Sequence, residues 1–166
     1  ADAEQGRPAA RPALVVMTPS ARDPTLAPRG KHVLYIWAQY HPYDLRGEGA
    51  AGWDTIRERE ADRLLATLGE YAPNFPAAVR DRQIYIQSPL DLERNVGFRH
   101  GNIMHLDMSL DQMFTFRPLP ELSSYRSHLP GLYLTGASTH PGGGVCGASG
   151  RSAAAAVLAD STRRRR

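Results

Sequence analysis

The segment GLYLTGASTHPGGGVCGASG, residues 131–150, decides the fold at the C-terminal end of this chain. It predicts a short apolar strand over 132–134, a glycine-dense loop, and an alanine-rich helix over about 145–160. Glycine accepts a positive φ and lets the backbone approach a ligand closely. A helix N-terminus offers unpaired N–H groups and the positive end of a dipole. The segment therefore predicts either a binding site for an anionic or electron-rich part of a cofactor, or a surface loop that only caps the helix.

Three of these glycines also match a nucleotide-binding pattern, Gly142-x-Gly144-x-x-Gly147. That pattern binds a dinucleotide when it forms the first turn between a strand and a helix, with a further strand and an acidic residue about 20 positions later. Here the printed sequence ends too soon, and Asp160 lies too close to the glycines. The loop is therefore not expected to bind the ADP end of a cofactor.

Bulk composition predicts a globular protein with a neutral body. The 166 residues are 42% apolar and 22% charged, which is enough for one domain or slightly more. The net charge is +3, but the run 163–166 is all arginine, so we expect no nucleic-acid binding. No apolar run approaches the ~20 residues of a membrane-spanning helix, and the first residues are polar. These features predict a soluble, cytoplasmic protein without a transmembrane segment.

Periodicity predicts a small number of regular elements before the glycine loop. The predicted strands span 13–17, 31–40 and 82–87, and the predicted helix spans 53–71. Its apolar stripe consists of Ile56, Ala61, Leu64, Leu65 and Leu68. Ser88 followed by Pro89 predicts a second helix start. Residues 97–128 show no pattern beyond a turn of helix around 109–114.

Several side chains invite a chemical interpretation that their spacing does not support. His100, His105 and Asp107 do not fall on one helix face, so we expect hydrogen-bonded histidines and no metal site. Cys146 lies near a helix start, where its thiol could be activated, but a small buried packing residue is the preferred interpretation. Ser138 and Ser149 lack the Gly-x-Ser-x-Gly elbow of a nucleophilic serine.

The remaining candidates are aromatic or lie beside the glycines. Trp37 and Trp53 are expected to be core or interface residues. For His140 two interpretations stay open: it contacts a ligand, or it holds the loop through hydrogen bonds to the backbone.

Five motifs in order resemble the C-terminal part of phytoene dehydrogenase-related FAD-dependent oxidoreductases, in the branch with a pyridine nucleotide-disulfide oxidoreductase domain. The motifs are Ser88-Pro89-x-Asp91-Leu-Glu-Arg94, Gly101-Asn102-Ile-x-His105, Asp111-Gln112-Met-Phe, Arg117-Pro118, and Tyr125-Arg-x-x-Leu-Pro-Gly131-Leu-Tyr-Leu-Thr-Gly136-Ala-x-x-His140-Pro-Gly-Gly-Gly144-Val-x-Gly147. The resemblance is dense over about 80–158 and extends back to residue 13.

The resemblance implies an α/β fold of mixed α+β character and a division into four segments. These are a flexible lead-in over 1–12, a substrate-binding domain portion over 13–128, the returning strand, loop and helix of an FAD-binding domain over 129–160, and a basic tail over 161–166. The nucleotide-binding half that precedes such a segment in the family is absent from this sequence. We therefore expect a fragment or one half of a split protein.

The resemblance also implies a cofactor and a set of residues that contact it. The cofactor is FAD, the substrate is an apolar small molecule whose C–C or C–N bond is oxidised, and the flavin performs the hydride chemistry. The residues expected to contact the isoalloxazine ring are Gly136, Ala137, His140, Pro141, Gly142, Gly143, Gly144, Val145 and Gly147. Asn102, His105 and Arg117 are expected to line the cleft, and no catalytic acid or base is assigned.

Two other functions remain open on the sequence. The chain could be a catalytically silent interaction module, or one part of a split flavoenzyme, with the missing half or a second copy as its partner. The glycine loop could instead bind another phosphate compound. Apolar surface left uncovered by a missing domain would favour self-association.

Overall fold

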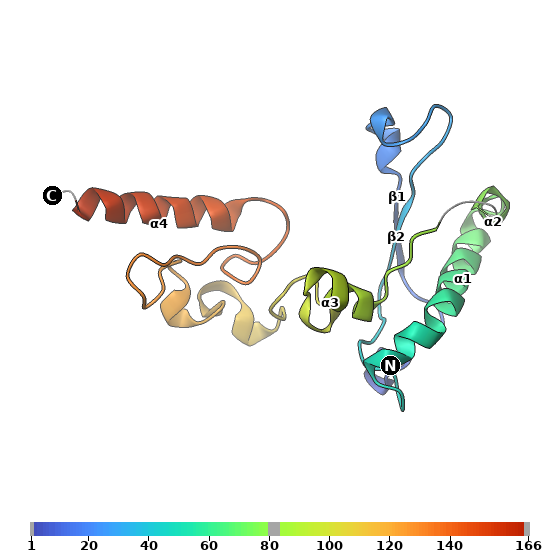
Figure 1. The fold of residues 1–166 in the computed structure, drawn as a ribbon, viewed down its shortest axis with the longest axis horizontal. Helices are drawn as coiled ribbons and strands as arrows, with labels where there is room; N and C mark the ends of the chain where they lie inside the picture. Colours follow the sequence, from blue (N-terminus) through green and yellow to red (C-terminus); the bar gives the residue numbers. More distant parts are fainter. Residues whose placement is uncertain (1, 80–83, 165–166) are drawn as a thin grey trace. The chain divides into compact units, whose positions relative to one another are not determined.

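The computed structural model describes residues 2–79 and 84–164, which form two compact units, Ala1–Gly101 and Asn102–Arg166 (Figure 1). The regular elements are β1 (Leu14–Met17), β2 (Tyr35–Ala38), α1 (Trp53–Tyr71), α2 (Phe75–Val79), α3 (Pro89–Val96) and α4 (Ala148–Arg164). A short 3-10 turn precedes β1 at Ala3–Gln5, and others lie between the regular elements at Pro19–Ala21, Pro24–Leu26, Ala50–Gly52, Arg99–Gly101, Leu110–Gln112, Phe114–Phe116 and Pro120–Leu122. Helices and a small sheet agree with the predicted mixed α+β class.

In the first unit, β1 and β2 form an antiparallel pair in which Leu14 faces Ala38 and Met17 faces Tyr35. Both strands leave much of their apolar surface exposed, including Val16 at 39% and Trp37 at 40%. The strand predicted over 31–40 is shorter in the structure, where β2 spans Tyr35–Ala38. A two-stranded ribbon gains little stability of its own, so this unit depends on its helices.

Helix α1 has the bounds that the sequence predicts, and its N-terminal part carries the core. Trp53 is 2% exposed and packs with Ile56, Leu45 and Leu90. The indole N–H of Trp53 donates to the carbonyl oxygens of Pro42 and Tyr43, at 3.1 and 3.0 Å. Satisfying this polar group allows the large ring to be buried.

The rest of the predicted apolar stripe on α1 is only half-buried. Leu64, Leu65 and Leu68 keep partial exposure, whereas Glu60 and Thr67 are buried. Glu60 is paired with Arg63, at 3.0 Å, on the next turn. A pocket of about 360 Å³ lies between α1 and β1, lined among others by Thr67, Leu68 and Tyr71 of α1 and by Leu14 and Val16 of β1.

Helix α3 begins with the capping box that Ser88 and Pro89 predict. The Ser88 hydroxyl accepts from the Asp91 N–H at 3.1 Å, and the Asp91 carboxylate accepts from the Ser88 N–H at 2.8 Å. Arg57 of α1 donates to the same carboxylate, and Arg94 donates to Asp54 with two bonds. These contacts join α3 to α1.

In the second unit, a narrow turn takes the place of the predicted strand 132–134. Only Tyr133 forms a bridge, with Arg126, although Leu134 N–H also donates to the Tyr125 carbonyl oxygen at 2.8 Å. The Arg126 guanidinium holds Asp160 of α4 through two bonds of 2.8 and 3.1 Å. Asp160 thereby ties α4 to the turn.

Two other predictions concern the chain ends and the region before α3. Of the predicted strand 82–87, residues 82 and 83 lie outside the described residues, and 84–87 have no regular structure. Helix α4 continues to Arg164, into the predicted basic tail. Within the described ranges, no helix is long and apolar enough to cross a membrane.

Candidate cofactor-binding loop

The predicted site residues lie on one loop of the second unit, which leads into α4. The loop has an inner part that packs on its own unit and an outer part that faces solvent. Gly142 is buried and Gly143 is half-buried, whereas Gly144, Val145 and Gly147 are exposed. The structure therefore separates the predicted residues into two groups with different surroundings.

The glycines of the inner part lie against side chains of the same unit. A Cβ on Gly143 would lie 3.1 Å from the Met104 Cε, and one on Gly142 would lie 3.6 Å from Met108 and 3.8 Å from the Arg117 Nε. Gly142 also has a φ of 105°, which side-chain-bearing residues rarely adopt. The close approach at Gly142 and Gly143 is thus to the protein's own side chains.

Arg117 ties the start of this loop to the segment 104–107. Its side chain is 1% exposed, and its Nε and Nη2 donate to the Ala137 carbonyl oxygen at 2.9 and 2.7 Å. Its Nη1 and Nη2 also donate to the carbonyl oxygens of Asp107, Met104 and Leu106. Arg117 therefore does not face an open cleft within this unit, contrary to the expectation from the sequence.

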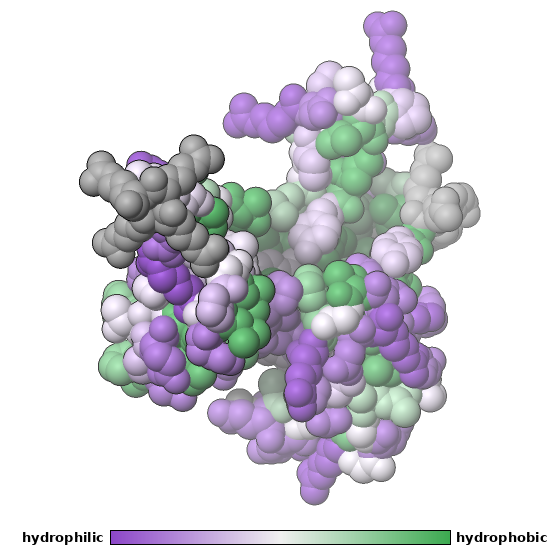
Figure 2. Space-filling model, turned by 60° about the vertical axis from the view of Figure 1, so that its left-hand side comes forward, coloured by the Kyte–Doolittle hydropathy of each residue, from purple (hydrophilic) through white to green (hydrophobic). Residues whose placement is uncertain are grey.

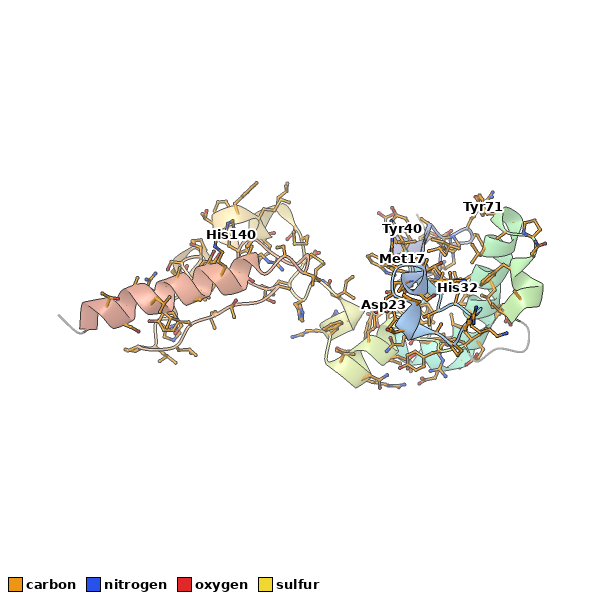
Figure 3. All side chains as sticks on the ribbon, turned by 90° about the horizontal axis from the view of Figure 1, so that it is seen from above. Met17, Asp23, His32, Tyr40, Tyr71 and His140 are labelled. Atoms are coloured by element: carbon orange, nitrogen blue, oxygen red, sulfur yellow. The ribbon has the colours of Figure 1, made fainter. Side chains whose placement is uncertain are left out.

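His140 holds the loop through the backbone, which is one of its two predicted roles. Its Nδ1 lies 3.0 Å from the Phe114 carbonyl oxygen, and its own carbonyl oxygen accepts from the Tyr125 hydroxyl at 2.9 Å (Figure 3). Tyr125 is 8% exposed. The adjacent Thr139 is buried and its hydroxyl donates to the Gly136 carbonyl oxygen at 2.9 Å.

The outer part of the loop presents open backbone. A Cβ on Gly144 would meet nothing within 4 Å, although the φ of 129° there strains any other residue. Val145 has a φ of 53° and is fully exposed. A β-branched residue with a positive φ is a rare and strained conformation, and such outliers concentrate at binding and active sites.

The outer loop ends at the N-terminus of a helix. Helix α4 begins at Ala148, and the N–H groups of its first turn have no acceptor within the helix. They carry the positive end of the helix dipole and favour an electron-rich acceptor. The exposed backbone of the outer loop therefore leads directly into a helix N-terminus that favours an electron-rich acceptor.

Other predicted residues have roles that the sequence did not indicate or indicated wrongly. Cys146 is exposed, so the prediction of a buried packing residue is wrong. Asn102 stabilises its own turn, because its side-chain oxygen accepts from the Met104 N–H at 2.9 Å. His105 is exposed and has a φ of 64°. Trp53 is a core residue as predicted, whereas Trp37 is partly exposed on β2.

A second polar cluster lies in the first unit, around Glu93. The Tyr43 hydroxyl and the His100 N–H both donate to its carboxylate, and the His100 ring stacks on Tyr43 with centroids 4.8 Å apart. The bond from Tyr43 lowers the pKa of Glu93, and the same bond raises the pKa of Tyr43. Across the ranges that the structure describes, no group of three or more His, Cys, Asp or Glu residues is arranged to hold a metal ion.

Sequence comparison identifies relatives over nearly the whole chain. Pyridine nucleotide-disulfide oxidoreductase domain-containing protein 2 of Rattus norvegicus is 46% identical over 160 residues, which is 96% of this chain and 27% of the relative. A phytoene desaturase (lycopene-forming) of a Paracoccus strain is 32% identical over 87% of this chain and 27% of the relative. One of the limonene dehydrogenase subunits of Castellaniella defragrans is 34% identical over 65% of this chain and 20% of the relative.

These matches define both the family and the extent of the similarity. No protein-family model and no solved structure matches the chain. The chain spans about a quarter of the length of the relatives, as the 27% coverage of the first one shows, and it corresponds to a C-terminal portion of them. This identity over almost the full chain confirms the resemblance seen in the motifs. The chain belongs to the family of pyridine nucleotide-disulfide oxidoreductase domain-containing protein 2 and the phytoene desaturases.

Proposed function

We propose that this chain is the flavin-facing, C-terminal portion of an FAD-dependent oxidoreductase that acts on an apolar small molecule. The identity of 46% over 96% of the chain carries this proposal, because it places the chain in a family whose named members are an oxidoreductase-domain protein and desaturases. The substrate class follows from the names of those relatives, which act on phytoene or limonene.

The loop residues have separate duties in this proposal. Ala137, His140, Gly142 and Gly143, which are buried or half-buried, form the packed inner loop together with the exposed Gly136 and Pro141. Gly144, Val145 and Gly147 present the outer backbone to the isoalloxazine ring, next to the first turn of α4. When bound, FAD supplies the acceptor for a hydride from substrate. The chain contributes shape and the dipole of α4, and no acid or base in the loop is needed for that transfer.

The decisive experiment uses a chimera in which this chain replaces the matching C-terminal segment of the rat relative, which supplies the preceding part. We expect the purified chimera to retain the visible absorption of bound FAD after gel filtration. A chimera that folds but retains no flavin, while the parent rat protein does, contradicts the proposal.

A glycine pair provides the matched variants for this test. Gly144→Asp adds a carboxylate where the ring is expected and should abolish flavin retention. Gly131→Asp is the control, because Gly131 also has a positive φ of 84° and open space around it, but lies in the turn before the loop. Equal flavin retention by the two variants would remove the loop from the proposed site.

A second candidate function is an interaction module or one part of a split enzyme. The observation in its favour is the apolar surface on the described residues, such as Val16, Phe114 at 73% exposure and Leu158 at 67% (Figure 2). Mixing the chain with the preceding part of the rat relative, expressed separately, distinguishes the two. Flavin retention only in the mixture supports a split enzyme, and a complex without flavin supports a silent module.

A further inference from the structure

Arg117 combines deep burial with an acceptor set that contains no carboxylate. The side chain is 1% exposed, and its donors bond to the carbonyl oxygens of Ala137, Asp107, Met104 and Leu106. Among the described residues, no carboxylate forms an ion pair with it within 4.0 Å. A buried guanidinium without a counter-ion is costly unless it is fully hydrogen-bonded. Here backbone carbonyls perform that task.

The acceptors come from two separate parts of the second unit. Three carbonyls belong to the segment 104–107, and the fourth belongs to Ala137, 20 residues from Arg117 in sequence, at the start of the glycine loop. From this anchor the loop continues through tight turns, in which Thr139 N–H bonds to the Gly136 oxygen and Gly142 N–H to the Thr139 oxygen at 2.7 Å. Fixing Ala137 therefore helps to fix the inner loop as far as Gly142, from which the outer loop continues.

The guanidinium also brings a fixed charge to the back of the loop. Its Nε lies 3.8 Å from the position that a Cβ on Gly142 would occupy. No ion pair within the described residues neutralises this charge, so it adds a positive potential that the low dielectric of the interior does not screen well. The dipole at the start of α4 has the same sign. Both features favour an electron-rich group on the outer side of the loop.

We propose that Arg117 is the positioning residue of the glycine loop, which holds the loop through the Ala137 carbonyl and places a positive charge behind the ligand without contacting it. With flavin as the ligand, this inference rests on the proposed function. Lysine cannot replace this arginine, because an ammonium group lacks the planar fork that spans four carbonyls.

The first test needs neither a variant nor a ligand. In the wild-type chain labelled with nitrogen-15, we expect the Arg117 Nε–H to exchange with water at least about tenfold more slowly than the Nε–H of Arg59, which is largely exposed. A folded chain in which the Arg117 Nε–H exchanges as fast as that of Arg59 overturns the proposal.

The second test compares two arginines of the same unit by hydrogen exchange of backbone amides. Arg117→Lys should speed exchange in the loop 136–144 by about tenfold or more, because the Ala137 anchor is lost. Arg126→Lys is the control, since Arg126 binds Asp160 outside the loop, and exchange in 136–144 should then stay as in wild type. Faster loop exchange in both variants, or in neither, overturns the proposal.

The third test uses the chimera with the rat relative and separates the two proposals. If the wild-type chimera retains no FAD, the proposed function fails, while the exchange measurements still decide the role of Arg117. If it retains FAD, Arg117→Lys and Arg117→Gln should both weaken binding. The reduction potential should be more negative with glutamine than with lysine, because only lysine keeps the charge. Equal potentials for the two variants overturn the electrostatic role, since a purely structural tie would give that result.

Discussion

The two units of this chain are stabilised in different ways. The first has an apolar core around Trp53, built on the periodic sequence of α1 and joined to α3 by ion pairs. The buried apolar residues described in the second are Tyr125 and the small Ala153 and Ala156, and this unit depends on Arg117, Tyr125 and Arg126 bonding to backbone and to Asp160. Because this unit buries little apolar side-chain surface, the position of the loop depends on hydrogen bonds from polar side chains. Hydrogen bonds are directional, whereas apolar contacts are not.

The largest effect should come from the core of the first unit. Trp53→Ala removes a fully buried indole and leaves a cavity, so we expect the free energy of unfolding to fall by about 4 kcal/mol. Urea denaturation followed by circular dichroism measures this loss. Trp37→Ala is the control on β2, and we expect it to cost much less, because Trp37 is 40% exposed. Equal losses would mean that the stability of the first unit is not concentrated in the core around Trp53.

In the second unit, the loss of a single side-chain hydrogen bond should already lower the free energy of unfolding, because this unit depends on such bonds. Tyr125→Phe removes only the hydroxyl that donates to the His140 carbonyl oxygen and should cost about 1 kcal/mol. Hydrogen exchange in the loop 136–144 should become faster by several-fold. Tyr40→Phe, at a residue 66% exposed, should leave stability unchanged. No change in loop exchange with Tyr125→Phe would contradict the importance of side-chain bonds to the backbone.

The helix cap tests how much of the first unit depends on local sequence. Ser88→Ala removes the hydroxyl that caps α3 and should lower the free energy of unfolding by about 1 kcal/mol. Ser109→Ala removes a hydroxyl that caps no helix and should have an effect within about 0.5 kcal/mol of zero. Both are measured by thermal or urea unfolding. A similar loss for both variants would remove the cap as the cause.

A dependence of stability on acidic pH is expected from the buried carboxylate of Asp91 in the first unit. Burial by itself raises the pKa of Asp91, but the Ser88 N–H, the Ser88 hydroxyl and Arg57 together hold it below its ordinary value. A lowered pKa in the folded state stabilises the protein above the unfolded value of about 3.9, and this stabilisation is lost as the pH falls through the folded pKa. Unfolding measured from pH 7 down to 2 should therefore show a loss beginning near pH 4.

The variant Asp91→Asn provides the check on that assignment. It removes the titrating group, so the stability curve should be flatter below about pH 4 than in wild type, and lower at neutral pH. A curve with the same slope as wild type would assign the acid sensitivity to other carboxylates, such as Asp54 and Glu93, whose pKa values are also lowered by hydrogen bonds.

The sequence by itself determined the elements whose signals are local. The bounds of α1 follow from its periodicity and from the prolines after it, and the start of α3 follows from Ser88 and Pro89, because a capping box needs only residues within one turn. The ordered motifs also determined the family, and the relatives confirmed it. The fold class, a mixture of helices and a small sheet, was predictable from the same patterns.

Only the tertiary structure decided which groups pack against the glycine loop and which part of the loop is exposed. The partners of Arg117 are backbone carbonyls, and every residue has one, so no residue type in the sequence indicates them. The same holds for the division of the loop into packed glycines at 142 and 143 and open backbone from 144 onward. Exposure of Cys146 and the reduction of 132–134 to one bridge follow from this long-range geometry too. Local patterns fix elements, because their interactions span a turn, whereas burial and hydrogen-bond partners depend on segments that only folding brings together.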